Sequence, residues 1–133
     1  MAVGDIAAVP VGGISLEFAP GAVCGSTTTM YVGTVGGYIK SLTTAGVLAD
    51  LTTKVRLPGR IATIVLSAYT YPIIAILEDG DVYAVATDGS TKTKICSLGA
   101  RCRAAYYYSN YVYCILDGQD NRLDSSLVSI HLA

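Results

Sequence analysis

Four short apolar segments separated by tight turns follow one another in the middle of the chain. Segment 62–67 is rich in β-branched residues, and 72–77 is a continuous apolar run, typical of a strand buried on both faces. An Asp-Gly turn leads to a third apolar segment, 82–86, because Asp-Gly tolerates the positive φ that hairpin turns require. After a second Asp-Gly turn, polar alternation over 91–96 indicates an exposed edge strand. The pattern predicts one four-stranded antiparallel sheet.

The same pattern recurs on both sides of this unit. Gly37 lies 43 residues before Gly80, and Gly118 lies 38 residues after it, each at the turn that follows a strand-like segment. We expect a single domain, 1–133, with repeat units at about 14–57, 61–98 and 102–132. In the first unit we expect 14–18 to be the first strand and 47–55 to be the outer strand. The last unit contains only three strand-like segments, and 5–11 is left over before the first. We therefore expect 5–11 to be the outer strand that completes the last unit, where Pro10 is acceptable because proline belongs on edge strands.

One segment of the middle unit carries a resemblance to a known fold. Residues 75–85, Ala-Ile-Leu-Glu-Asp-Gly-Asp-Val-Tyr-Ala-Val, resemble blades of the broad β-propeller superfamily, such as the NHL and quinoprotein-like repeats. The resemblance covers one unit well and the other two loosely. The chain lacks the Trp-Asp signature and the tryptophans of quinoprotein blades, since it has no tryptophan at all. The resemblance implies an architecture of four-stranded blades and no particular activity.

The number of units bears on the assembly. We predict an all-β fold of three four-stranded antiparallel blade-like units, which is a half β-propeller closed by oligomerisation. Propellers close a ring with about four to eight blades, and a stacked repeat needs a neighbour to cover each apolar face. Two copies would give six blades, so we expect a homodimer that forms a six-bladed ring. A single-chain β-barrel or sandwich is the alternative, because these folds are also built from hairpins.

The composition supports burial against other subunits. Charged residues make up 14% of the chain, compared with about 25% in typical soluble domains, and the mean hydropathy is +0.50.

The net charge is −1 and there is no basic run, so we expect no nucleic-acid partner, since phosphate contacts need clustered positive charge. The uncharged stretch 61–77 is shorter than the ~20 residues of a spanning helix, so we expect no membrane role. No signal peptide is recognisable, which favours an intracellular or virion-associated protein.

The four cysteines give no metal pattern. Cys24, Cys96, Cys102 and Cys114 form no CxxC pair, so a zinc site is disfavoured. Without a secretory signal we expect buried free thiols. If a disulfide exists, Cys96 and Cys102 are the first pair to test, because they flank a turn-like Gly-Ala. Neither of the two Gly-Gly pairs precedes a helix, so no phosphate-binding loop and no cofactor are expected.

Tyrosines and arginines concentrate in the last unit. Tyr106, Tyr108 and Tyr111 lie close in sequence to Arg101 and Arg103. Strand alternation places Tyr106 and Tyr108 on one face of the sheet and Tyr107 on the other. Exposed tyrosines beside arginines can stack on sugars or hold a protein partner. The competing interpretation is packing between blades, which also uses aromatic residues.

The loop after Leu116 is the longest insertion in the repeat, and we expect Asp120, Asn121 and Arg122 to contact a partner there. Asp117, Asp120 and Asp124 are weak candidates for calcium ligands, because they lack the alternating spacing of an EF-hand, and a polar surface turn explains them better. His131, the single histidine, is tied by sequence to no Ser or Cys nucleophile.

These features favour a non-enzymatic structural or interaction protein, an oligomeric scaffold that presents loops to a protein or glycan partner. The low charge and the Gly-, Thr- and Ala-rich hairpins are also typical of viral structural or accessory proteins. The alternative is a carbohydrate-binding (lectin-like) or hydrolytic propeller that uses Arg60, Arg101, Arg103 and tyrosines. Convergence of these arginines with Glu78 or Asp81 in one pocket would favour that alternative, and their scatter over the rim would oppose it.

Overall fold

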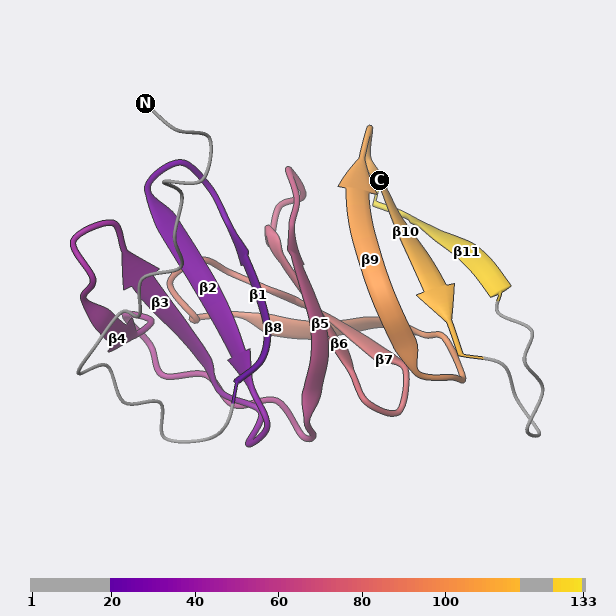
Figure 1. Cartoon of the computed structure of the whole chain (residues 1–133), viewed down its shortest axis with the longest axis horizontal. Coiled ribbons are helices and arrows are strands. Elements are labelled where there is room, and N and C mark those ends of the chain that lie inside the picture. The colour runs from indigo at the N-terminus through magenta and orange to yellow at the C-terminus, as the bar shows by residue number, and fades with distance from the viewer. Residues whose placement is uncertain (1–19, 118–125, 133) are drawn as a thin grey trace, which may run out of the picture.

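The part of the chain that the structure describes is built from β-strands. The computed structural model describes residues 20–117 and 126–132, which form three antiparallel sheets placed one after another (Figure 1). The first sheet contains β1 (Pro20–Gly25), β2 (Thr29–Thr34), β3 (Ile39–Thr43) and β4 (Leu48–Asp50); the second contains β5 (Ile61–Leu66), β6 (Ile73–Leu77), β7 (Asp81–Val85) and β8 (Lys92–Ser97); the third contains β9 (Cys102–Tyr108), β10 (Tyr111–Leu116) and β11 (Ser126–His131). Over these two ranges, no helix is long and apolar enough to cross a membrane.

Asp-Gly turns connect the strands of the middle sheet, as the sequence predicts. Gly80 has a φ of 96° and Gly89 a φ of 80°, in the left-handed region that glycine adopts without strain. The carboxylate of Asp79 accepts a hydrogen bond from the Asp81 amide at 3.0 Å. In the second turn, the Asp88 carboxylate accepts hydrogen bonds from the amide and the hydroxyl of Ser90, and these hydrogen bonds lower the pKa of Asp88. Both turns are thus fixed by their own side chains.

The sheets are stacked like blades, with their first strands side by side. β1 lies against β5 and β5 lies against β9 (Figure 1). All five residues of β6 are buried, because the middle sheet is covered on both faces. Ile73, Ala75 and Leu77 pack in a core shared with the first sheet, whereas Ile74 and Ile76 pack in a core shared with the third. The continuous apolar run of β6 therefore indicates a strand whose sheet lies between two neighbouring sheets.

The described strands confirm the all-β, blade-like architecture. They form three separate sheets in an open arrangement rather than a closed single-chain barrel. The third sheet has three strands, in the order β11-β10-β9. The segment 5–11, predicted to be its outer strand, lies outside the described residues, as does 14–18. The strand that pairs with β2 is β1, from Pro20 to Gly25.

The outer strand of the first sheet is shorter than the run 47–55 suggests. Only Leu48–Asp50 pairs with β3. Leu51, Val55 and Leu57 instead bury their side chains in the core between the first two sheets, and the Thr53 amide donates a hydrogen bond to the Asp88 carbonyl at 2.7 Å. The alternating apolar residues of this stretch thus form a linker that ties the first sheet to the second.

Candidate functional site

One face of the third sheet carries three rows of side chains that no other described element covers. The strand register places Tyr108, Tyr111 and His131 in one row. Tyr106, Tyr113 and Ser129 form the second row. Ala104, Ile115 and Leu127 form the third row. We call these nine residues the tyrosine face.

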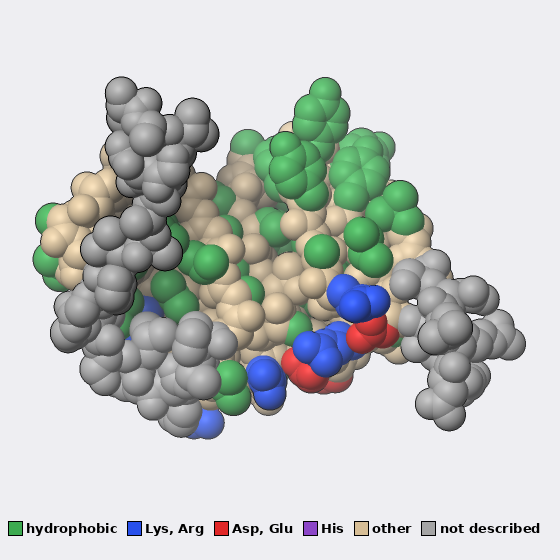
Figure 2. Space-filling view, in the orientation of Figure 1, with side chains coloured by type: hydrophobic (Ala, Val, Ile, Leu, Met, Phe, Trp, Pro, Cys, Tyr) green, Lys and Arg blue, Asp and Glu red, His purple; other side chains and the backbone are tan. Residues whose placement is uncertain are grey.

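The tyrosine face is exposed and apolar. Tyr106 is 69% exposed, Tyr108 65% and Leu127 71%, and Figure 2 shows hydrophobic side chains gathered over β9 and β10. No residue of the face is an acid, a lysine or an arginine. The opposite face of the same sheet, including Val112 and Cys114, is buried in the core shared with the middle sheet.

Local geometry orders the aromatic rings at one end of this face. The turn between β9 and β10 consists of Ser109 and Asn110, whose positive φ values of 50° and 68° match the two-residue hairpin turns that follow the twist of the strands. The ring of Tyr111 stacks on His131 with 4.6 Å between centroids and on Tyr113 with 6.0 Å. These contacts restrain the three rings.

A row of ion pairs runs along a different edge of the molecule, where strands of the second and third sheets begin or end (Figure 2). Glu78 lies between Arg60, at 3.6 Å, and Arg101, at 3.4 Å, while Arg103 pairs with Asp117 at 3.1 Å. The second and third sheets share the same backbone hydrogen bond at this edge. The amide of Glu78 donates to the Arg60 carbonyl, and the amide of Asp117 donates to the Arg101 carbonyl, both at 2.8 Å. All three arginines are more than half exposed, so each pair stabilises the fold by at most about 1 kcal/mol.

The structure separates the predicted site residues into two groups. Tyr106, Tyr108 and Tyr111 lie on the tyrosine face, whereas Arg101 and Arg103 belong to the ion-pair row. Tyr107 is half-buried on the opposite face, as strand alternation predicts. Asp120, Asn121, Arg122 and Asp124 lie outside the described residues. Asp117 pairs with Arg103, and residues 20–117 and 126–132 contain no group of three His, Cys, Asp or Glu side chains that could hold a metal ion.

Sequence reasoning did not single out Tyr113, Ile115 and Leu127 as one surface. Tyr113 pairs with Tyr106, and Ile115 pairs with Leu127. The register of β10 against its two neighbours therefore brings these residues together. Alternation within each strand could have found the exposed positions, but not the way in which they align.

The thiols are free, and two of them meet inside the second core. All four cysteines are unpaired, Cys96 and Cys102 included. A hydrogen bond from the Cys114 thiol, with a smaller contribution from Thr63, lowers the pKa of Cys102 to about 7, while that same hydrogen bond and burial raise the pKa of Cys114. Burial raises the pKa of Cys24 to about 11. Cys102 and Cys114 are almost fully inaccessible to solvent, which makes them core residues that also interact with each other.

Comparison with known proteins identifies the class of fold. No protein-family model matches the chain, and no curated protein is similar to it. The computationally designed Ika4 protein is 14% identical with a TM-score of 0.65, over 89% of this chain and 69% of that one. BBS1N, crystallised in complex with ARL6DN, is 15% identical with a TM-score of 0.64, over 90% of this chain and 36% of that one. The WD40 β-propeller domain of Doa1 is 11% identical with a TM-score of 0.60, over 77% and 36%.

These structures are β-propeller proteins, and the chain has the fold of a part of such a propeller. It spans about a third of the length of BBS1N and of the Doa1 domain. Identities this low show a common fold and nothing about a common activity.

Proposed function

We propose that the chain is a non-enzymatic structural or interaction protein, an oligomeric β-propeller-like scaffold that presents its loops to a partner. The observation that carries the proposal is the tyrosine face. The two faces of the middle sheet are buried against neighbouring sheets, whereas the corresponding face of the third sheet leaves Tyr106, Tyr108 and Leu127 mostly exposed. Contiguous apolar surface of this kind is typical of an interaction site.

The occupant that best fits this face is a second copy of the chain. Propellers close with about four to eight blades, and three sheets are described here. In a two-fold symmetric dimer, the third sheet of each copy would lie against the first sheet of the other. Both open ends would be covered and a ring of six blades would result.

The segment 5–11 has a place in the same assembly. We propose that it supplies the outer strand next to β11, and in a ring dimer this strand would come from the partner. The connection to β1 would then be 12–19, which is intermediate in length between the two described linkers, 51–60 and 98–101. The chain between the strands is thus long enough for this arrangement.

The charged side chains support binding rather than catalysis. Arg60 and Arg101 converge on Glu78, but they do so at an exposed edge, and Arg103 pairs separately with Asp117. The low charge content of the chain also fits a viral structural or accessory protein as one form of such a scaffold.

Light scattering on the purified chain at micromolar concentration tests the assembly. We expect twice the monomer mass of 13.8 kDa. A stable monomer would overturn the closed ring, and a trimer or larger species would overturn the six-bladed dimer. A glycan array with the wild type and Tyr108→Ala tests the alternative function, because saccharide binding that depends on Tyr108 would contradict a purely structural role.

A further inference from the structure

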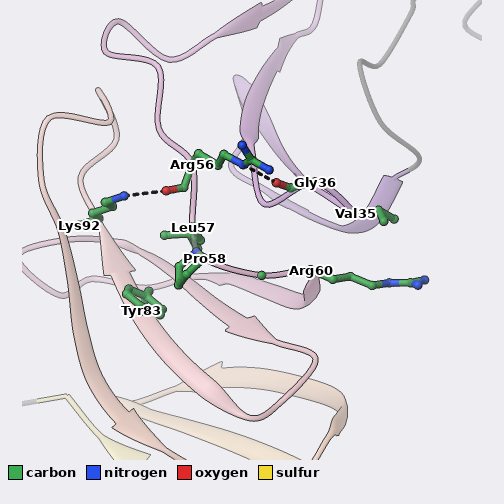
Figure 3. A pocket seen from close by; sticks show the side chains of 9 residues that line it. Val35, Gly36, Arg56, Leu57, Pro58, Arg60, Tyr83 and Lys92 are labelled. Atoms are coloured by element: carbon green, nitrogen blue, oxygen red, sulfur yellow. Dashed lines mark hydrogen bonds between the residues drawn. The ribbon is translucent and has the colours of Figure 1, made fainter.

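A cavity of about 510 Å³ lies between the first and second sheets, outside the tyrosine face and mostly away from the ion-pair row. Its walls come from the β2–β3 turn, from the linker before β5 and from β7 and β8, and Figure 3 shows the side chains that line it. This volume lies in the range of small-molecule sites, about 300–1,000 Å³. Three of the lining residues, Arg56, Arg60 and Lys92, are cationic, and none is acidic.

The backbone around the cavity is fixed by close contacts. The Leu57 amide donates a hydrogen bond to the Gly37 carbonyl at 2.8 Å, and Tyr38 forms a β-bridge with Arg56. Gly37 has a φ of 89°, and a Cβ atom there would collide with the Leu57 carbonyl oxygen. The turn and the linker are therefore in direct contact, so the cavity needs no rearrangement to form.

Two of the cations are held in place by carbonyl groups. Arg56 donates from Nε to the Gly36 carbonyl at 3.1 Å, and its guanidinium carbon lies 5.2 Å from the centre of the Tyr38 ring. Lys92 donates from Nζ to the Arg56 carbonyl at 2.6 Å. These contacts orient both cations without neutralising either.

The third cation, Arg60, already has a carboxylate partner. Arg60 pairs with Glu78 at 3.6 Å, and its side chain extends away from the other lining residues in Figure 3. Among the described residues, neither Arg56 nor Lys92 has an ion pair with a carboxylate. Among its described lining residues, the cavity thus has two positive charges that no carboxylate neutralises.

We propose that this cavity binds the phosphate or carboxylate group of a small anion, with Arg56 and Lys92 as its ligands. The planar Arg56 guanidinium has four terminal N–H donors besides Nε–H, which suit two oxygens of an oxyanion at once. Lys92 adds a compact positive charge with donors to spare. The half-buried Tyr83 lines the same cavity and would contact the organic part of the ligand. The site lies within one chain, so it does not depend on the ring dimer.

Titration of the ¹⁵N-labelled protein with inorganic phosphate, and separately with succinate, tests this site at constant ionic strength. We expect saturable shifts at Gly36, Gly37 and the Arg56 Nε–H. Lys92→Gln and Arg56→Gln should each weaken binding by about tenfold or more, because each removes a charge-assisted hydrogen bond. Lys94→Gln is the matched control, because it removes the same charge from the same strand, where Lys94 pairs with Asp81 at 3.3 Å.

The outcomes separate clearly. Saturation by phosphate alone, by succinate alone or by both supports the site and identifies the anion it prefers. No saturation by either anion at tens of millimolar would overturn it, as would equal weakening by Lys94→Gln, which would indicate nonspecific charge. Lys92 is exposed on an edge strand, so its substitution keeps the test decisive even if Arg56→Gln disturbs the linker.

Discussion

Substitution of Tyr106 by alanine tests the role of the tyrosine face in dimerisation. The side chain is 69% exposed in the isolated chain. A tyrosine side chain buries about 200 Å² when it is fully covered, so a partner could cover roughly 140 Å² more. At ~25 cal/mol per Å² this corresponds to about 3.5 kcal/mol per contact as an upper limit.

A two-fold ring contains this contact twice, so the upper limit for the dimer doubles to about 7 kcal/mol. Part of this gain is offset by lost side-chain freedom and by desolvation of the hydroxyl. If half remains, Tyr106→Ala weakens the dimer by about 3.5 kcal/mol, which is roughly 400-fold in Kd. Tyr106→Phe should change it little, because the apolar area is retained.

Sedimentation equilibrium over a dilution series measures this change. Lys94→Ala serves as the control, since it shortens an exposed side chain on the middle sheet, which lies at neither end of the stack. Circular dichroism must show that each variant keeps its β-structure. An unchanged Kd for a folded Tyr106→Ala dimer would refute the proposed contact.

Three further predictions concern the fold. Ile74→Ala removes a fully buried side chain and should lower the free energy of unfolding by about 2–5 kcal/mol in a urea titration. Gly37→Ala should destabilise more than Gly46→Ala in the same assay, because both have positive φ but only Gly37 lacks space for a Cβ atom. Cys114→Ala, in a background without Cys24 and Cys96, should raise the pKa of Cys102 above about 7, as thiolate absorbance would show. Since the hydrogen bond lowers this pKa in the folded state, its stabilising effect is present above the unfolded value, near 9.0, and is lost as the pH falls through about 7.

The middle blade could be predicted from local sequence because its determinants are local. The Asp79-Gly80 turn is fixed by neighbouring residues, and the apolar run of β6 marks a strand covered on both sides. Strand alternation likewise placed Tyr106 and Tyr107 on opposite faces. In these cases the physical cause lies within a few residues of its effect.

Features that depend on how strands and sheets align could not be read in this way. Arg56 and Lys92 are 36 residues apart and meet only because the linker after β4 packs against the second sheet. The composition of the third row of the tyrosine face depends on the pairing of Ile115 with Leu127. The sequence predicts Leu51 and Val55 to be strand residues, but they lie in the linker, because their side chains are buried against the second sheet.

The third sheet has both an uncovered apolar face and an unpaired strand edge among the described residues. Together they favour ring closure over binding of a small ligand or another protein to the tyrosine face. In the described part of the chain, the tyrosine face is uncovered and the outer side of β11 pairs with no strand. A small ligand or a flat partner surface could cover the tyrosines, but it would leave the β11 edge open to pairing with other chains. A second copy that brings both its first sheet and its segment 5–11 would satisfy the face and the edge at once. Deletion of residues 1–11 should therefore weaken the dimer without abolishing it, whereas loss of the tyrosine face should abolish it.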